Sequence, residues 1–159
     1  MSGFVSARQL TERQLIPGML AVIVSAMKRH SEIEGEDELP VLGQVEKLLT
    51  EAMREPLLGL PSDKASKIIR RTMRVTEAAM KPYFSLQLGV QYLIVAYWTR
   101  SLVERDVVQV GSESVFGKAW DLMADTMALA WDDLEQLEDL AIRGARELGE
   151  SLEAQGYFR

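Results

Sequence analysis

The chain has 159 residues, of which 47% are hydrophobic and 26% are charged, and its formal net charge at pH 7 is −6. This composition is typical of one globular domain and excludes a chain that is disordered throughout. The absence of cysteine excludes disulfide bonds and thiolate metal ligands, and it favours a cytoplasmic protein.

Two apolar runs are candidates for a signal peptide or a membrane span. The run Leu15–Met27 follows Arg8, as in a signal peptide, but Glu12 lies in the region that would have to be basic. Both this run and Leu86–Trp98 are shorter than the roughly 20 residues that a membrane-spanning helix needs. We therefore expect two buried helices and no membrane partner.

The first predicted helix ends at about His30. Thr11 and Gln14 have the spacing of a capping box, and Pro17 predicts a kink or a fresh start. The following residues, 31–40, contain five carboxylates, a glycine and a proline. This composition predicts an acidic, solvated loop.

Four further helices are predicted, separated by prolines, glycines and polar connectors. They cover about 41–55, 62–81, 83–105 and 114–152, and Ser112 or Ser114 is expected to cap the last one. Residues 153–159 are expected to form a flexible C-terminal tail. The sequence thus predicts a single all-α domain, residues 1–159, in which about five helices form a bundle around a hydrophobic central helix (about 83–105).

The third predicted helix has a basic face. Six of the 18 basic residues of the chain fall within roughly a third of its circumference, opposite an apolar face. Neighbouring like charges on a helix repel one another. We interpret this basic face either as a solvated surface or as a binding surface. Its residues, within 64–81, are Lys64, Lys67, Arg70, Arg71, Arg74 and Lys81.

The last predicted helix has a complementary acidic face. Between Ala119 and Ile142 there are seven acidic residues and no basic one. Five of them project within about 80° of one another if the helix is continuous. Such a face could be solvated, could pair with the basic face of the same or another copy, or could orient a partner protein. The five residues, within 121–139, are Asp121, Asp125, Asp132, Glu135 and Asp139.

Signatures of catalysis and cofactor binding are scarce. The single histidine, His30, cannot supply a zinc cluster, and the phosphate-binding loops G-x-x-x-x-G-K-[ST] and G-x-G-x-x-G are absent. Asp121 and Asp125 could hold magnesium, but no second acidic helix matches them. We therefore predict no catalytic residue, no metal, no cofactor and no enzyme activity. The aromatic residues of the central helix could line a small-molecule pocket, although core packing explains them more simply: Tyr83, Phe84, Tyr92, Tyr97 and Trp98.

The charged faces suggest two functions. The first is a non-enzymatic protein–protein interaction module, that is, an adaptor, inhibitor or assembly subunit that binds a protein partner or further copies of itself. The second is a nucleic-acid-binding subunit of a nucleoprotein complex, with the basic residues of 64–74 on phosphates. The acidic net charge and the lack of an aromatic residue on the basic face weigh against nucleic acid.

Overall fold

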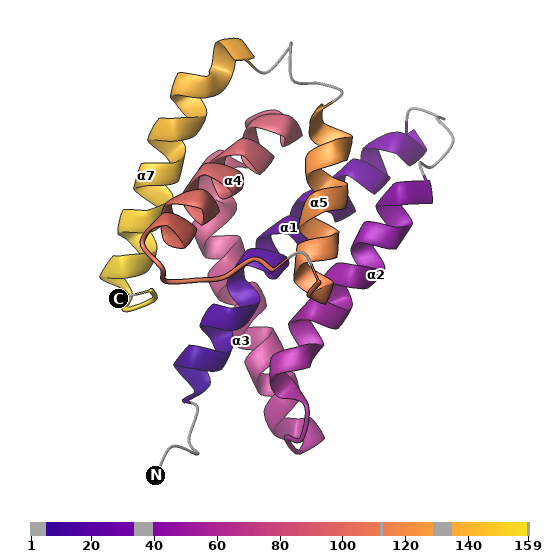
Figure 1. The fold of residues 1–159 in the computed structure, drawn as a ribbon, viewed down its shortest axis with the longest axis vertical. Helices are drawn as coiled ribbons and strands as arrows, with labels where there is room; N and C mark the ends of the chain where they lie inside the picture. The colour runs from indigo at the N-terminus through magenta and orange to yellow at the C-terminus, as the bar shows by residue number, and fades with distance from the viewer. Residues whose placement is uncertain (1–5, 34–39, 112, 129–134, 159) are drawn as a thin grey trace.

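The computed structural model describes residues 6–33, 40–111, 113–128 and 135–158. These residues form six α-helices and three short 3-10 helices, with no strand among them (Figure 1). The all-α bundle predicted from the sequence is thereby confirmed. The α-helices are α1 (Ala7–Ile33), α2 (Pro40–Arg54), α3 (Ser62–Met80), α4 (Leu88–Glu104), α5 (Val115–Ala128) and α7 (Glu138–Ala154); the 3-10 helices are η1 (Glu55–Leu57), η2 (Lys81–Tyr83) and η3 (Glu135–Leu137).

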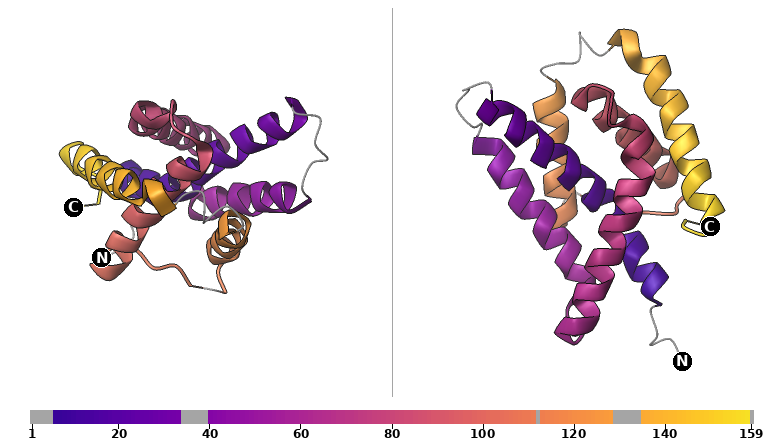
Figure 2. Two further views of the ribbon diagram at one scale, coloured as in Figure 1. Left: turned by 90° about the horizontal axis from the view of Figure 1, so that it is seen from above. Right: turned by 180° about the vertical axis from the view of Figure 1, so that it is seen from behind.

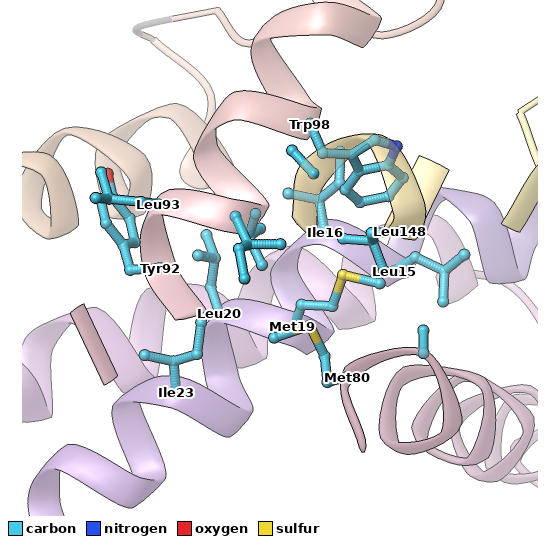
Figure 3. Packing of buried hydrophobic residues seen from close by; sticks show 14 of the residues in the cluster. Leu15, Ile16, Met19, Leu20, Ile23, Met80, Tyr92, Leu93, Trp98 and Leu148 are labelled. Atoms are coloured by element: carbon cyan, nitrogen blue, oxygen red, sulfur yellow. The ribbon is translucent and has the colours of Figure 1, made fainter. Parts of the chain in front are cut away.

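Helix α1 holds the bundle together. It packs extensively against α2, α3 and α4, and the rear view in Figure 2 shows α3 crossing over it. The extensive contacts of α4, by contrast, are with α1 and α7. The central position predicted for 83–105 is therefore held by α1, whose own apolar run fills the core. Figure 3 shows this packing, in which Leu15, Met19, Leu20 and Ile23 of α1 lie among Met80, Leu93, Trp98 and Leu148.

A buried amide joins the first three helices. Gln14 of α1 is 0% exposed, and its side-chain NH₂ donates to the backbone carbonyl of Met53 on α2. Its side-chain carbonyl accepts a hydrogen bond from the hydroxyl of Thr72 on α3, which is equally buried. One turn further along α1, a β-carbon at Gly18 would lie 3.1 Å from the Thr76 hydroxyl oxygen, so this glycine permits the close approach of α3. Helix α1 continues through Pro17 without a fresh start.

The predicted last helix, 114–152, is wrong as a single element. Helix α5 ends at Ala128, η3 and α7 follow from Glu135, and residues 129–134 lie outside the described residues. Helix α5 packs against α2, whereas α7 packs against α4 (Figure 1). The two segments cover different parts of the core, so they cannot continue along one axis.

The predicted acidic loop is shorter than 31–40. Helix α1 includes Ser31 and extends to Ile33, and α2 begins at Pro40. The residues between these two helices lie outside the described part of the chain. The carboxylates at 34, 36, 37 and 38 are among these residues.

Residues 153–158 are packed and do not form the flexible tail predicted for 153–159. Gly156 (φ +91°) ends α7 in a Schellman motif, in which the Tyr157 N–H donates to the Leu152 carbonyl at 2.9 Å. Tyr157 and Phe158 are 4% and 7% exposed. The Phe158 and Trp98 rings pack edge to face, with their centroids 5.3 Å apart. The backbone N–H of Phe158 donates to the side-chain carboxylate of Glu12 on α1 at 2.7 Å. The end of the chain thus closes against the start of α1.

The Gln14 amide can be tested by a substitution that preserves side-chain volume. Gln14→Met should lower the free energy of unfolding by about 2 kcal/mol, because it leaves the Met53 carbonyl without its partner and removes one of the two acceptors of the Thr72 hydroxyl, the other being the Ile68 carbonyl at 2.9 Å. Gln44→Met on the exposed side of α2 is the control and should change it by less than about 0.5 kcal/mol. Urea denaturation measures both, and equal stability of Gln14→Met and wild type would contradict the role of the amide.

The closed C-terminus leads to a second prediction. Phe158→Ala should lower the free energy of unfolding by about 3 kcal/mol, the usual cost of truncating a buried phenylalanine. Phe84→Ala is the matched control, because the Phe84 side chain is 46% exposed. Thermal unfolding, monitored by circular dichroism, distinguishes the two variants. If Phe158→Ala loses no more unfolding free energy than the control, the packing of Phe158 contributes nothing to stability.

Candidate functional site

The basic face lies on the outer side of α3. The inner side of this helix buries Ile68, Thr72 and Thr76 toward the interior, and α3 packs on α1 there. The basic side chains point the other way. Lys64, Lys67, Arg70, Arg74 and Lys81 are exposed, and Arg71 is partly exposed.

None of these six cations forms an ion pair with another described residue. The ion pairs within the described ranges join Lys28 to Glu46 at 3.4 Å and Arg105 to Glu153 at 3.3 Å, both away from α3. Among the six, Arg70 reaches only the backbone carbonyl of Ser66, at 3.4 Å. The described structure therefore leaves the positive charge of the basic face uncompensated.

A shallow groove borders the basic face. It is lined by the partly exposed apolar side chains of Ile69 and Met73, together with Lys67, Arg70, Arg74 and Glu77. It contains no aromatic side chain on which a nucleic-acid base could stack. The basic face thus combines charge with a strip of hydrophobic surface.

The acidic face does not form one stripe in the described structure. Asp121 and Asp125 are exposed on α5, Glu135 is exposed in η3, and Asp139 is exposed on α7. Asp132 lies outside the described residues. The projection that grouped these residues assumed one continuous helix, and the separation of α5 from α7 removes that assumption.

A cleft of about 540 Å³ lies between α4 and α5. Its walls carry the rings of Tyr92 and Tyr97 from α4 and of Trp120 from α5, with the Tyr92 and Trp120 centroids 6.3 Å apart.

The start of α5 is fixed by Ser114, whose hydroxyl oxygen accepts the Gly117 N–H at 2.9 Å. Ser114 is thus the cap of α5, as one of the two sequence-based alternatives predicted. Gly117 has no room for a β-carbon, which would lie 1.8 Å from the Gly111 carbonyl oxygen.

Polar groups occupy defined places in the α4/α5 cleft. Thr99 lines it and is 1% exposed, and its hydroxyl has no hydrogen-bond partner among the described residues. The Tyr97 hydroxyl donates to Glu138 at 2.9 Å, and the Arg100 guanidinium lies 6.0 Å from the Tyr97 ring centroid. The carboxylates of Glu104 and Asp121 lie on the exposed part of the lining.

Burial raises the pKa values of the two tyrosines of the cleft. It raises the pKa of Tyr92 from its ordinary value of 10.0 to about 12, because the phenolate would be poorly solvated. Burial also raises the pKa of Tyr97, and the hydrogen bond to Glu138 adds to this effect. Both phenols are therefore neutral at physiological pH and can act as hydrogen-bonding groups.

Two further classes of site were searched for in the described part of the chain. It contains no cluster of three or more His, Cys, Asp or Glu side chains that could hold a metal ion. None of its helices combines the length and hydrophobicity needed to cross a bilayer. No protein-family model, no curated protein and no solved structure matches the chain, so its function has to be inferred from the geometry described above.

Of the five aromatic residues that the sequence suggested for a pocket, Tyr92 and Tyr97 line this cleft, whereas Tyr83, Phe84 and Trp98 do not. Thr99 and Trp120 line the cleft and were not predicted. Thr99 carried a weak signal, because it is a polar residue in an otherwise apolar helix. Trp120 carried none, because its approach to α4 depends on the tertiary position of α5. The cleft is therefore a finding of the structure.

The raised pKa of Tyr92 predicts how stability depends on pH. The folded state favours the neutral phenol, so this contribution is intact below pH 10 and is lost as pH rises toward 12. As pH rises from 10 to 12, the free energy of unfolding should fall less for Tyr92→Phe than for wild type. The two losses should differ by on the order of 2 kcal/mol. Urea denaturation measures the free energy of unfolding of both proteins at pH 7 and above pH 10. Equal losses in the two proteins above pH 10 would contradict the raised pKa of Tyr92.

Proposed function

We propose that this chain is a non-enzymatic protein-binding module whose α3 basic face docks an acidic, amphipathic helix of another protein. The observation that carries the proposal is the juxtaposition of unpaired cations with the apolar strip of Ile69 and Met73. Charge and hydrophobic surface together suit a partner that has both.

The uncompensated charge of α3 supports a partner of opposite sign. Like charges three or four positions apart destabilise a helix by about 0.2–0.5 kcal/mol per pair. Arg70 and Arg74 are such a pair, and so are Lys67 and Arg71. Carboxylates of a partner would relieve this repulsion and would accelerate and orient docking.

The apolar strip argues for protein over nucleic acid. A helix that docks into a groove places apolar anchors along one side, and Ile69 and Met73, four positions apart, would contact such anchors. Phosphate binding would use the cations and leave these two side chains without a contact. Single strands would also find no aromatic side chain for base stacking in this groove.

A second copy of this chain is the other protein partner that supplies acidic helix surface. Asp121 and Asp125 are exposed one turn apart on α5. Pairing of the α3 basic face with this surface would be head to tail, which produces a ring or a filament. The oligomeric state in solution, measured by light scattering across a range of protein concentrations, distinguishes this arrangement from binding to a different protein.

The proposal is tested with three probes of matched negative charge: an acidic helical peptide with leucines four positions apart, a scrambled peptide of the same composition, and a DNA oligonucleotide. Fluorescence anisotropy should show tightest binding for the helical peptide. Arg70→Glu/Arg71→Glu/Arg74→Glu should weaken that binding at least tenfold, since it reverses three charges of the basic face, two of which line the groove. Arg29→Glu/Arg54→Glu/Arg143→Glu is the control, because it makes the same change in net charge at exposed positions on other helices.

Two results would overturn the proposal. Equal binding of the helical and scrambled peptides would show that the α3 face recognises charge alone. Tighter binding of the oligonucleotide, with a steep dependence on salt concentration, would support the nucleic-acid alternative.

A further inference from the structure

The α4/α5 cleft has the dimensions of a small-molecule site. Its volume of about 540 Å³ falls within the range of roughly 300–1,000 Å³ that is usual for ligand pockets. It is walled by aromatic rings, with Leu93 and Met127 among its apolar lining. Because α5 packs on α2, the side chains of α4 and α5 leave this space between them. The cleft is separate from the α3 basic face, which contributes no residue to it.

Thr99 gives the cleft a hydrogen-bonding group that the described protein leaves unused. Buried polar groups in proteins are nearly always hydrogen-bonded, and an unpaired one destabilises the fold. The neighbouring buried polar residue of α4, Gln91, follows this rule, since its amide donates to the Leu86 carbonyl at 2.9 Å. Valine would fill the position of Thr99 without an unpaired hydroxyl. A ligand in the cleft would supply the missing partner.

The charges of the cleft favour a cationic ligand. Two exposed carboxylates, Glu104 and Asp121, face one guanidinium, Arg100, so the lining is negative by one charge at neutral pH. Neither carboxylate forms an ion pair with a described residue. The faces of Tyr92, Tyr97 and Trp120 also attract cations, because the π-electrons make each face negative. Arg100 already lies near the Tyr97 ring and Tyr92 is buried, which leaves Trp120 as the open aromatic surface.

We propose that the α4/α5 cleft binds a planar organic cation. Its aromatic body lies against Trp120, a polar group on it exchanges a hydrogen bond with the Thr99 hydroxyl, and its positive charge is balanced by Asp121 and Glu104. This site adds small-molecule recognition to a chain whose α3 face is proposed to bind protein. It does not depend on that function.

Two acridines of the same ring system provide the test. Proflavine is a planar cation at pH 7, and acridine-9-carboxylate carries a negative group on the same tricyclic frame. Each is titrated into the wild-type protein while its fluorescence anisotropy is followed. Proflavine should bind saturably and at least tenfold more tightly than the anion, and Asp121→Asn should reduce this preference.

The role of Thr99 is tested with a matched pair of variants. Thr76 is the other buried threonine in the described residues whose hydroxyl lacks a partner, and it lies beside Gly18, outside the cleft. Thr99→Val and Thr76→Val should both fold at least as stably as wild type, because each removes an unpaired polar group. Only Thr99→Val should weaken proflavine binding, by about fivefold, the value of one ordinary hydrogen bond.

Three results would overturn this inference: no saturable binding of proflavine, equal binding of the anionic acridine, or an equal effect of Thr99→Val and Thr76→Val on affinity. The peptide-binding experiment on the α3 basic face is independent of these measurements. Failure at one site therefore leaves the other result intact.

Discussion

The buried amide of Gln14 is the interaction on which the arrangement of this bundle depends. It gives α1 one polar partner on α2 and another on α3, in a region otherwise filled by apolar side chains. Hydrophobic contacts tolerate many rotations of one helix against another, whereas a hydrogen bond between defined atoms does not. Thr72 lies on the buried side of α3, so the same hydrogen bond holds that side against α1 and is compatible with the outward direction of the cations.

Two surfaces of the molecule differ in their chemistry. The α3 face concentrates cations beside a narrow apolar strip, while the α4/α5 cleft concentrates aromatic rings beside carboxylates. The chain as a whole is acidic, so a cationic surface is a local departure from its average and requires a local explanation. The two surfaces differ in the sign of their charge and in their content of aromatic side chains.

Helical periodicity was enough to predict the fold class and the outward direction of the α3 cations, but not the path of the chain after α5. No glycine or proline in residues 118–143 marks a break between α5 and α7, although these helices pack against different parts of the bundle. The packed C-terminus had a local signal, since Gly156 before two aromatic residues fits a helix-ending Schellman motif. No sequence pattern predicted the whole cleft, because its walls come from α4 and α5, and the relative position of these helices depends on tertiary packing.

Contacts between the two ends of the chain have a consequence for biosynthesis. Arg8 donates to the Gln155 carbonyl and Glu12 accepts from the Phe158 N–H, so these bonds join residues 147 and 146 positions apart. Translation proceeds at about 5–20 residues per second, so the start of α1 waits on the order of ten seconds for these partners to leave the ribosome. The helix at the centre of the core thus precedes all of its packing partners along the chain. Helices α2, α3 and α4, which cover the apolar side of α1, are made before these partners, so the start of α1 is the part of that helix whose hydrogen bonds are completed last.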